Sequence, residues 1–595
     1  MKSIVCELEQ RVSAALSAAF GEAGAKVDPL VRTAQNPEFG DYQSNCAMGL
    51  AKKLGRKPRD VAQDIIDALD VADLCAPPEI AGPGFVNFRL ETSAVAARLR
   101  SIPPAPREGV DRMGIAPASA PITVVVDMSS PNLAKEMHVG HLRSTILGDG
   151  IARILEFQGH RVHRINHVGD WGTQFGMLVA YLRKTKPEVL GQLDRLRLPD
   201  LEAFYVAAKA EFDRNPEFAD EARKTVTRLQ GGDAETLSIW KAFCDESLRH
   251  CHALYDRLDV RIEDRGESSY NDLLSGVVED LRSMGLAMVS EGAVCVFLDG
   301  FINREGAPLP MMVQKSDGGY NYATTDLTAL KYRVERLGAK RVVYVVGVTQ
   351  KQHLAMLFAA ARKAGWVPKD VVTEHIAFGS VLAPDGQPFK TREGGTIKLK
   401  DLLDEAVARG LQVVEANEDD DAKARGLNAA ARAKIAETVG MAAVKYFDLS
   451  HNLASDYQFN FDHMLAMEGN TAPYMLYAYA RIRSIGRKAG VDFSDLHADA
   501  AIVIEHESEV KLGKVLVRFP DVVATVAAEL KPNILTDYLF EVSKAFSLLY
   551  DRVRGVRVID APQAFRTSRL RLCDLTARTL KLGLGLLGIK TLDQM

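Results

Sequence analysis

The chain has 595 residues, of which 47% are hydrophobic and 26% charged, and its 74 basic and 78 acidic side chains leave a formal net charge of -4. This composition is typical of globular proteins and excludes a fibrous repeat or a disordered chain. The near-neutral charge excludes a polycation, so any nucleic-acid surface must be local. At about 150 residues per domain, the length indicates roughly four domains.

The first hundred residues predict a small α+β domain. Apolar residues recur at every fourth position near the N-terminus, which predicts an amphipathic helix: Ile4, Leu8, Val12, Leu16 and Phe20. Residues 84–90, GFVNFRL, predict a strand. A passage rich in Pro, Gly, Ala and Ser then extends from Pro103 to Pro121, which is typical of a linker. We therefore expect an N-terminal domain over residues 1–108 and an exposed linker over 109–121.

The N-terminal residues and the cysteines indicate a cytoplasmic protein. Glu7 and Glu9 stand where a signal peptide needs apolar residues, and no uninterrupted apolar stretch reaches the roughly 18 residues of a spanning helix. The seven scattered cysteines include no C-x-x-C pair and no zinc spacing, so we expect buried free thiols in a reducing cytosol. We expect no membrane attachment and no protein-bound structural metal.

Residues 122–455 predict a Rossmann-type catalytic domain. The run ITVVVDM at 122–128 is typical of a strand buried on both faces of a parallel sheet. A helix over 141–157 and a strand over 161–168 complete a β-α-β unit. Further strands are expected at 341–348 and 375–379. Residues from about 171 to 340 are too many for a loop and predict an inserted, largely helical subdomain.

From about residue 456 the strand signals disappear, and amphipathic stretches such as 511–530 and 568–588 predict helices. We expect an all-α bundle over residues 456–595. Its last 45 residues, 551–595, contain nine basic and four acidic side chains. The expected fold is therefore multidomain α/β: a small α+β domain, a Rossmann-type parallel-sheet domain with a helical insertion, and a C-terminal α-helical bundle.

The sequence His138-Val139-Gly140-His141 lies between a predicted parallel strand and the first turn of a helix. Free N–H groups and the helix dipole favour an anion there, so a triphosphate would fit beside the two imidazoles. Gly140 has no Cβ, which would let a nucleotide lie against the backbone. Alternatively, the motif arises by chance and its histidines are ordinary surface or core residues.

The segment SSPNLAKEMHVGHLRSTILGDGIARILEFQGHRVHRINHVGDWGTQFG resembles the signature of class I aminoacyl-tRNA synthetases, in particular arginyl-tRNA synthetase. Further blocks resemble the family in the same order: DGGYNYATTD, VTQKQH, PFKTREGGTIKL, MEGNTAPYMLYAYAR and RLCDLTARTLKLGLGLLG. The resemblance covers nearly the whole chain. It implies ATP-dependent activation of L-arginine to arginyl-adenylate, then transfer to the 2'-hydroxyl of the terminal adenosine of tRNA(Arg). It also implies that Mg2+ enters with ATP and that activation requires bound tRNA.

Because charge develops on phosphoryl oxygens during activation, His138 and His141 are the candidate catalytic donors. The family's second phosphate-binding loop normally carries two lysines, but the matching residues here, Gln387 to Arg392, include only Lys390. Lys390 and Arg392 are candidate ATP ligands with His138, Gly140 and His141. Lys135, three residues before His138, is a candidate substitute for the missing charge. Alternatively, Lys390 and Arg392 belong to a solvated charged segment.

Arginine as a substrate demands carboxylates, because its guanidinium is always protonated. Asp127 ends the first parallel strand, where ligands of open sheets bind. Asp326 follows Tyr322 by four residues, which places both on one helix face.

The resemblance assigns the arginine's amino or carboxylate end to Asn132 and Gln350, the flank of its guanidinium to Tyr322, and a further substrate contact to His138. Alternatively, Asp326 caps a helix and Asn132 forms a turn.

The resemblance also implies contacts with tRNA at both ends of the chain. Residues 38–45 are similar to an element that contacts the tRNA elbow, and Phe39, Gln43 and Asn45 are its candidate ligands. The C-terminal positions that match residues facing the anticodon loop are Tyr474, Tyr477, Arg481, Tyr550 and Met595. Aromatic residues at helical spacing could equally belong to the core.

Three other functions remain open on the sequence alone: a catalytically silent RNA-binding paralogue, an adenylyltransferase for a small molecule, and a synthetase for another amino acid. Retention of His138, His141, Asp127 and Asp326 disfavours the first. The helical, basic C-terminus disfavours the second, and the two carboxylates disfavour a neutral amino acid. We expect a monomeric arginine-tRNA ligase whose partners are ATP, L-arginine and tRNA(Arg), although nothing in the sequence fixes the oligomeric state.

Overall fold

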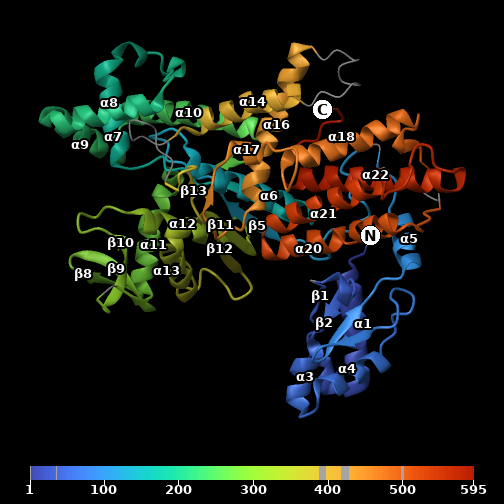
Figure 1. Ribbon diagram of the computed structural model, residues 1–595. Coiled ribbons are helices and arrows are strands. Elements are labelled where there is room, and N and C mark those ends of the chain that lie inside the picture. Colours follow the sequence, from blue (N-terminus) through green and yellow to red (C-terminus); the bar gives the residue numbers. More distant parts are fainter. Residues whose placement is uncertain are drawn as a thin grey trace. The chain divides into compact units, whose positions relative to one another are not determined.

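The computed structural model describes residues 2–34, 36–106, 108–303, 305–387, 397–416, 428–496, 501–551 and 553–594. The chain forms two compact units. One contains Met1–Pro117 together with Ala466–Met595, and the other contains Ala118–Ala416 and Ala430–Leu465. Figure 1 traces both along the chain.

The second unit is built on a five-stranded parallel sheet of order β12-β11-β5-β6-β7. Its strands are β5 (Thr123–Asp127), β6 (Arg161–Asn166), β7 (Glu263–Asp264), β11 (Arg341–Gly347) and β12 (Val372–Phe378). All three valines of β5 are fully buried, as their β-branched run predicts. From β5 the chain continues to β6 and β7 on one side of the sheet, and from β11 it continues to β12 on the other side. The strand order therefore reverses between β5 and β11, and in open sheets ligands bind at the carboxyl ends of the strands at such a point.

Helix α6 (Val139–Phe157) connects β5 to β6, and α13 (Lys351–Lys363) connects β11 to β12. The approach of α6 to the sheet is so close that a Cβ on Gly148 would lie 2.4 Å from the Cβ of Met128. The buried Arg143 of α6 donates to the carbonyl oxygens of Gly379 (2.9 Å) and Ser455 (3.1 Å). Arg143 therefore fixes α6 against two segments that are distant in the sequence.

The inserted residues form more than helices. The helices are α7 (Thr173–Thr185), α8 (Leu201–Arg214), α9 (Pro216–Gln230), α10 (Ala234–Arg257) and α11 (Asn271–Ser283). An antiparallel sheet follows, of β8 (Ala287–Ser290), β9 (Ala293–Ile302) and β10 (Pro308–Gln314). The expectation of a largely helical insertion was therefore incomplete, because residues Glu291 and Gly292, both with positive φ, turn β8 back onto β9.

The remaining elements of this unit are α12 (Tyr322–Glu335), β13 (Val381–Leu382), α14 (Leu399–Ala416), α16 (Ala429–Ser450), β14 (Tyr457–Gln458) and α17 (Phe461–Met464). Strand β14 pairs in parallel with β13. The sequence predicted no strand after residue 456, because a two-residue strand leaves no alternating pattern.

The N-terminal part of the first unit contains a four-stranded antiparallel sheet of order β1-β2-β4-β3. Its strands are β1 (Val31–Thr33), β2 (Tyr42–Ser44), β3 (Glu79–Ala81) and β4 (Phe85–Phe88). The helices are α1 (Ile4–Phe20), α2 (Glu22–Ala25), α3 (Cys46–Leu54), α4 (Pro58–Asp67) and α5 (Thr92–Arg100). The apolar residues of α1 at four-residue spacing are buried up to Leu16, as the sequence predicts.

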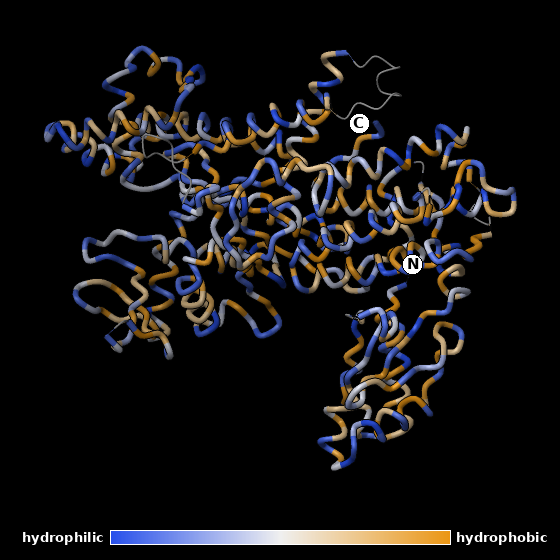
Figure 2. The backbone as a smooth tube through the Cα atoms, in the orientation of Figure 1, coloured by the Kyte–Doolittle hydropathy of each residue, from blue (hydrophilic) through white to orange (hydrophobic). Residues whose placement is uncertain are grey.

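The C-terminal part of the same unit is helical, and Figure 2 shows hydrophobic and hydrophilic positions alternating along its helices. These helices are α18 (Ala472–Lys488), α19 (Glu507–Val517), α20 (Phe519–Glu529), α21 (Asn533–Leu549) and α22 (Gln563–Leu586). The stretch 511–530, expected as one helix, divides at Arg518, because Pro520 in the first turn of α20 lacks the N–H that would continue α19.

The passage expected as an exposed linker is partly buried. Met113 and Ile115 are buried, and Arg578 of α22 binds Asp111 with a shortest distance of 2.6 Å. Arg578 also donates to the carbonyl oxygen of Pro103 at 2.8 Å. Proline-rich backbone has carbonyl oxygens without helical or strand partners, and here Arg578 of α22 satisfies that of Pro103.

Six of the seven cysteines are buried free thiols, whereas Cys6 is exposed, contrary to the expectation for all seven. Across the residues the structure describes, no helix is both long and apolar enough to span a bilayer.

Candidate active site

The two histidines of the His138–His141 motif cap the N-terminus of α6. His138 is the N-cap residue, and its Nδ1 accepts a hydrogen bond from the Gly140 N–H at 3.0 Å. The Nδ1 of His141 accepts from the His138 N–H at 3.1 Å. Because each Nδ1 acts as an acceptor, each neutral ring carries its proton on Nε2. The site therefore presents two N–H donors beside a positive helix end.

Both imidazoles are held in the neutral form at pH 7. Burial, followed by the charge of Lys135, lowers the pKa of His138. Burial, followed by the charge of His138, lowers the pKa of His141 to about 4. The ring centroids are 4.1 Å apart, so a proton on one ring would be repelled by a proton on the other.

The structure gives a different reason for glycine at position 140. A Cβ there would lie 2.7 Å from Cε1 and 2.9 Å from Nδ1 of His138. Gly140 therefore makes room for the His138 ring over the helix end. The sequence alone predicts instead that the missing side chain leaves room for a nucleotide against the backbone.

The cationic residues expected to bind phosphate are only partly described. Lys390 and Arg392 lie outside the described residues. Lys135 is exposed, and its Nζ lies 4.6 Å from the centroid of the Tyr205 ring. Since its charge depresses the pKa of His138, Lys135 acts on the same site electrostatically.

Asp127, at the end of β5, is already paired with an arginine of the chain. Its Oδ2 lies 2.6 Å from Nη2 of the buried Arg333, and its Oδ1 accepts from the Ser130 hydroxyl at 3.1 Å. The Arg333 guanidinium also lies 5.0 Å from the Tyr344 ring centroid. The sequence did not foresee this internal pair, which occupies one oxygen of the carboxylate expected to bind substrate.

Asp326 lies in the second turn of α12, which begins at Tyr322, so it does not cap the helix; Asn321 holds the N-cap position. Its Oδ2 is 2.6 Å from His353 Nε2, and its Oδ1 is 3.6 Å from His167 Nε2. The ring of the exposed Tyr322 packs edgewise on His353, with centroids 5.1 Å apart. These contacts leave Asp326 partly exposed.

Three further residues near Asp326 were missed by the sequence analysis. The pKa of Glu267 is raised to about 7 by burial, with contributions from the charges of Asp326 and Asp170. Asp170 is buried and accepts from the N–H and hydroxyl of Ser268. Both ring nitrogens of His167 are buried, and neither has a hydrogen-bond partner. All three follow the carboxyl ends of β6 or β7, which is the sequence signal that could have identified them.

Asn132 and Gln350 lie in different elements. The Asn132 Oδ1 accepts from the Ala134 N–H and from Gln174 Nε2, both at 3.0 Å, so this residue does form a turn, as the alternative interpretation predicted. Gln350 ends a 3-10 turn after β11 and is the N-cap residue of α13. Both residues are exposed.

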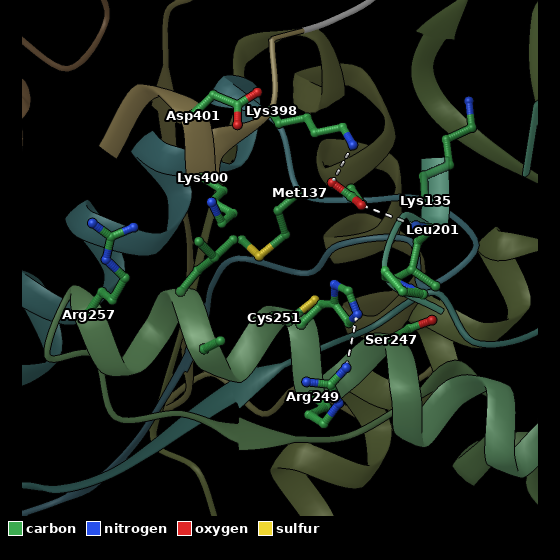
Figure 3. A pocket seen from close by; sticks show the side chains of 15 residues that line it. Lys135, Met137, Leu201, Ser247, Arg249, Cys251, Arg257, Lys398, Lys400 and Asp401 are labelled. Atoms are coloured by element: carbon green, nitrogen blue, oxygen red, sulfur yellow. Dashed lines mark hydrogen bonds and ion pairs between the residues drawn. The ribbon is translucent and has the colours of Figure 1, made fainter. Parts of the chain in front are cut away.

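Behind the His138 segment lies a cavity of about 410 Å3. Figure 3 shows Met137 and Cys251 at its centre and Lys135, Lys398 and Arg257 around its edge. Each arginine and lysine here already contacts an acidic or aromatic side chain, for example Arg257 with Asp404 at 2.7 Å and Lys135 with Tyr205. The cavity therefore has a charged but internally paired rim.

The candidate tRNA ligands of the N-terminal domain differ in their contacts. Phe39 is 47% exposed, and Asn45 is exposed at the start of α3. Gln43 donates to Asn87 at 2.7 Å. The neighbouring Tyr42 is fully buried and donates to Asp521 at 2.9 Å, so it is a core residue.

Three of the C-terminal candidates, Tyr477, Arg481 and Tyr550, line one cavity of about 770 Å3. The Arg481 guanidinium lies 4.8 Å from the Tyr550 ring centroid. Tyr474 is half-buried, and its hydroxyl is 3.2 Å from that of Ser547. Met595 lies outside the described residues.

Comparison with protein families gives three matches. The model for "tRNA synthetases class I (R), catalytic domain" matches residues 112–461. The "DALR anticodon binding domain" matches residues 475–595, and the "Arginyl tRNA synthetase N terminal domain" matches residues 6–90.

Curated relatives match along the whole chain. A protein of Nostoc sp. strain PCC 7120 named arginine–tRNA ligase is 53% identical over 99% of both chains. Another of the same name, from Synechococcus elongatus, is 52% identical over 100% of both. Among solved structures, the arginyl-tRNA synthetase of Plasmodium falciparum aligns with a TM-score of 0.86 and 30% identity over 100% of both chains. The Thermus thermophilus arginyl-tRNA synthetase aligns with a TM-score of 0.80 at 24% identity and shares the fold.

We predict that His141 makes folding stability depend on pH. Its pKa is about 4 when folded, against 6.5 for the free side chain, so between these values the unfolded chain takes up a proton that the folded protein does not. Stability then falls as the pH falls, by about 2 kcal/mol from this ring between pH 7 and pH 5.

His141→Asn, whose Oδ1 can accept the His138 N–H, should lose less stability over that pH range than the unchanged protein, as measured by unfolding temperature. The control is His463→Asn, which replaces an exposed histidine. If both variants show the pH dependence of the unchanged protein, the low pKa of His141 is wrong.

Proposed function

The chain belongs to the class I arginyl-tRNA synthetases and ligates arginine to tRNA(Arg) in translation, and we propose how its residues divide the reaction. The observation that supports the assignment best is the fixed orientation of His138 and His141 at the start of α6. The family match disfavours a small-molecule adenylyltransferase and a synthetase for another amino acid. Retention of the two histidines and of Asp127 and Asp326 disfavours a silent paralogue.

We propose that the Nε2–H groups of His138 and His141 donate to phosphoryl oxygens of ATP during activation. The carboxylate of arginine attacks the α-phosphorus, pyrophosphate leaves, and negative charge grows on the oxygens beside the helix end. Donors that are already oriented cost no reorganisation at that moment. Charged rings would form a tight ion pair with the departing pyrophosphate and slow its release, and neutral rings do not form such a pair.

We propose that Lys135, Lys390 and Arg392 supply positive charge to the triphosphate, with Lys135 in place of the second loop lysine. Mg2+ would enter on the phosphate oxygens of ATP. Within the described parts of the chain, no group of three His, Cys, Asp or Glu side chains is placed to hold a metal ion. Phosphate oxygens are ligands that suit this hard cation.

For arginine recognition, we propose that Asp326 and Glu267 meet the guanidinium, and that Asp127 acts on the pocket through Arg333. Asp326 is partly exposed, whereas Asp127 already pairs with Arg333 at 2.6 Å. Burial, followed by the charges of Asp326 and Asp170, raises the pKa of Glu267 to about 7. A guanidinium bound beside Glu267 would favour its charged form. Tyr322 would flank the guanidinium, and Asn132 and Gln350 would hold the other end of the arginine.

For tRNA, we propose one contact at each end of the chain. Phe39, Gln43 and Asn45 would meet the elbow, and the cavity lined by Tyr477, Arg481 and Tyr550 would receive a base of the anticodon loop, with Tyr474 nearby. A cation over an aromatic ring, as at Arg481 and Tyr550, suits stacking on an unpaired base. We place the domain boundaries at 1–108, 122–455 and 456–595, and we propose that the enzyme is a cytoplasmic monomer.

We predict that His138→Ala and His141→Ala each lower the kcat of ATP–pyrophosphate exchange by roughly 100-fold, the range for loss of one oriented donor. Exchange is measured with tRNA(Arg) present, and tRNA binding should remain nearly unchanged. The exposed His463, in the same unit, provides the control variant His463→Ala. Full exchange activity in either test variant would remove that histidine from the mechanism.

We predict that arginine binding releases a proton near pH 7. With a pKa of about 7, Glu267 is half protonated there, and a bound guanidinium would ionise it. Calorimetry in buffers of different ionisation enthalpy should detect about half a proton per arginine at pH 7, and weaker binding below pH 7. Glu267→Gln should abolish the release, and an equal release from that variant would contradict the proposed contact.

A further inference from the structure

Residues 397–399 pair directly with the His138 segment. The Val139 N–H donates to the carbonyl oxygen of Ile397 at 3.3 Å, and the Leu399 N–H donates to that of Met137 at 3.0 Å. Lys398 and His138 thereby stand opposite each other in an isolated antiparallel bridge. Whatever displaces Lys398 would also shift the backbone that orients the His138 ring.

The Lys398 side chain extends along this bridge to two carboxylates. Its Nζ is 3.2 Å from Oε2 of Glu136 and 3.0 Å from Oδ1 of Asp200. In Figure 3, the dashed line from Lys398 marks its ion pair with Glu136. Lys398 therefore links the segment before α6, the start of α14 and the start of α8.

Each carboxylate has a second task that fixes its position. Glu136 accepts from the Leu201 N–H at 3.1 Å through its other oxygen. Asp200 caps α8 by accepting from the Ala203 N–H at 2.8 Å. With both acceptors held by backbone, the ammonium of Lys398 has a defined geometry, unlike a lysine on an open surface.

The charges matter because Glu136 is two residues before His138. Only 16% of its side chain is exposed, so its negative charge is weakly screened by solvent. Without Lys398 this carboxylate would lose the ion pair that compensates it, two residues before the ring proposed to bind the triphosphate. A fixed negative charge there would oppose both ATP binding and the charge that develops during activation.

We propose that Lys398 is a positioning residue for arginine activation, holding residues 397–399 against the His138 segment and neutralising Glu136 beside the phosphates of ATP. This inference rests on the proposed role of His138. It predicts that Lys398 affects ATP and turnover while leaving arginine recognition unchanged, because Asp326 and Glu267 lie on other elements.

The test measures ATP–pyrophosphate exchange with tRNA(Arg) present. Lys398→Met should lower kcat/KM for ATP at least tenfold and change KM for arginine less than twofold. Lys398→Arg, which keeps the charge, should stay within about threefold of the unchanged enzyme. The matched control is Lys400→Met: Lys400 lines the same cavity and pairs with Asp404 at 2.7 Å on its own helix.

A second variant separates charge from folding. Glu136→Gln keeps an acceptor for the Leu201 N–H but removes the charge. The double variant Glu136→Gln/Lys398→Met should therefore have a kcat/KM for ATP at least threefold higher than that of Lys398→Met. A purely structural role for Lys398 would give no such recovery. If Lys398→Met unfolds at the assay temperature, the kcat/KM for ATP of the double variant and of Lys398→Arg is compared with that of the unchanged enzyme instead.

Three results would overturn the inference: Lys398→Met behaving like Lys400→Met, an equal rise in KM for arginine, or a double variant no better than Lys398→Met. His138→Ala in the same assay keeps the two proposals distinguishable. Full exchange activity in His138→Ala would contradict the proposed role of His138, whatever Lys398 does.

Discussion

The first turn of α6 has backbone N–H groups that need acceptors, and two imidazoles supply them. Serine or threonine would satisfy the same groups but would leave no second donor. A neutral histidine that accepts a hydrogen bond through Nδ1 must carry its proton on Nε2. The hydrogen bond that caps the helix therefore also fixes which ring nitrogen can donate to a substrate. The rest of the site depends on it, because α6 is the first helix after β5 and Arg143 fixes this helix against Gly379 and Ser455.

The substrate side of the site is organised by a different constraint, the placement of charge in a partly buried pocket. The chain supplies its own guanidinium at Arg333, which forms an ion pair with Asp127. This leaves Asp326, Glu267 and Asp170 as three carboxylates near one another. Burial raises the pKa values of Glu267 and Asp170, and for Glu267 the charges of Asp326 and Asp170 add to the rise. A pocket of this kind stabilises an added cation more than a neutral side chain of similar size.

Sequence patterns predicted the elements whose signals are local. Strand β5 was predictable because its valines are buried on both faces of the sheet, and the start of α6 because His138 precedes a helical apolar pattern. The partner of Asp127 was not predictable, since Arg333 reaches it only through the packing of α12 against the sheet. The burial of Met113 was likewise hidden, because proline-rich composition describes backbone shape and carries no information about arginines on α22.

The account depends most on the protonation of two rings, and nitrogen NMR of histidine-labelled enzyme measures it directly. Comparison with His138→Gln and His141→Gln would assign the two signals among the 13 histidines. The account predicts that both rings are neutral at pH 7 with the proton on Nε2, and that His141 stays neutral at pH 5, since its pKa is about 4. A charged ring at pH 7, or a proton on Nδ1 of either, would contradict it.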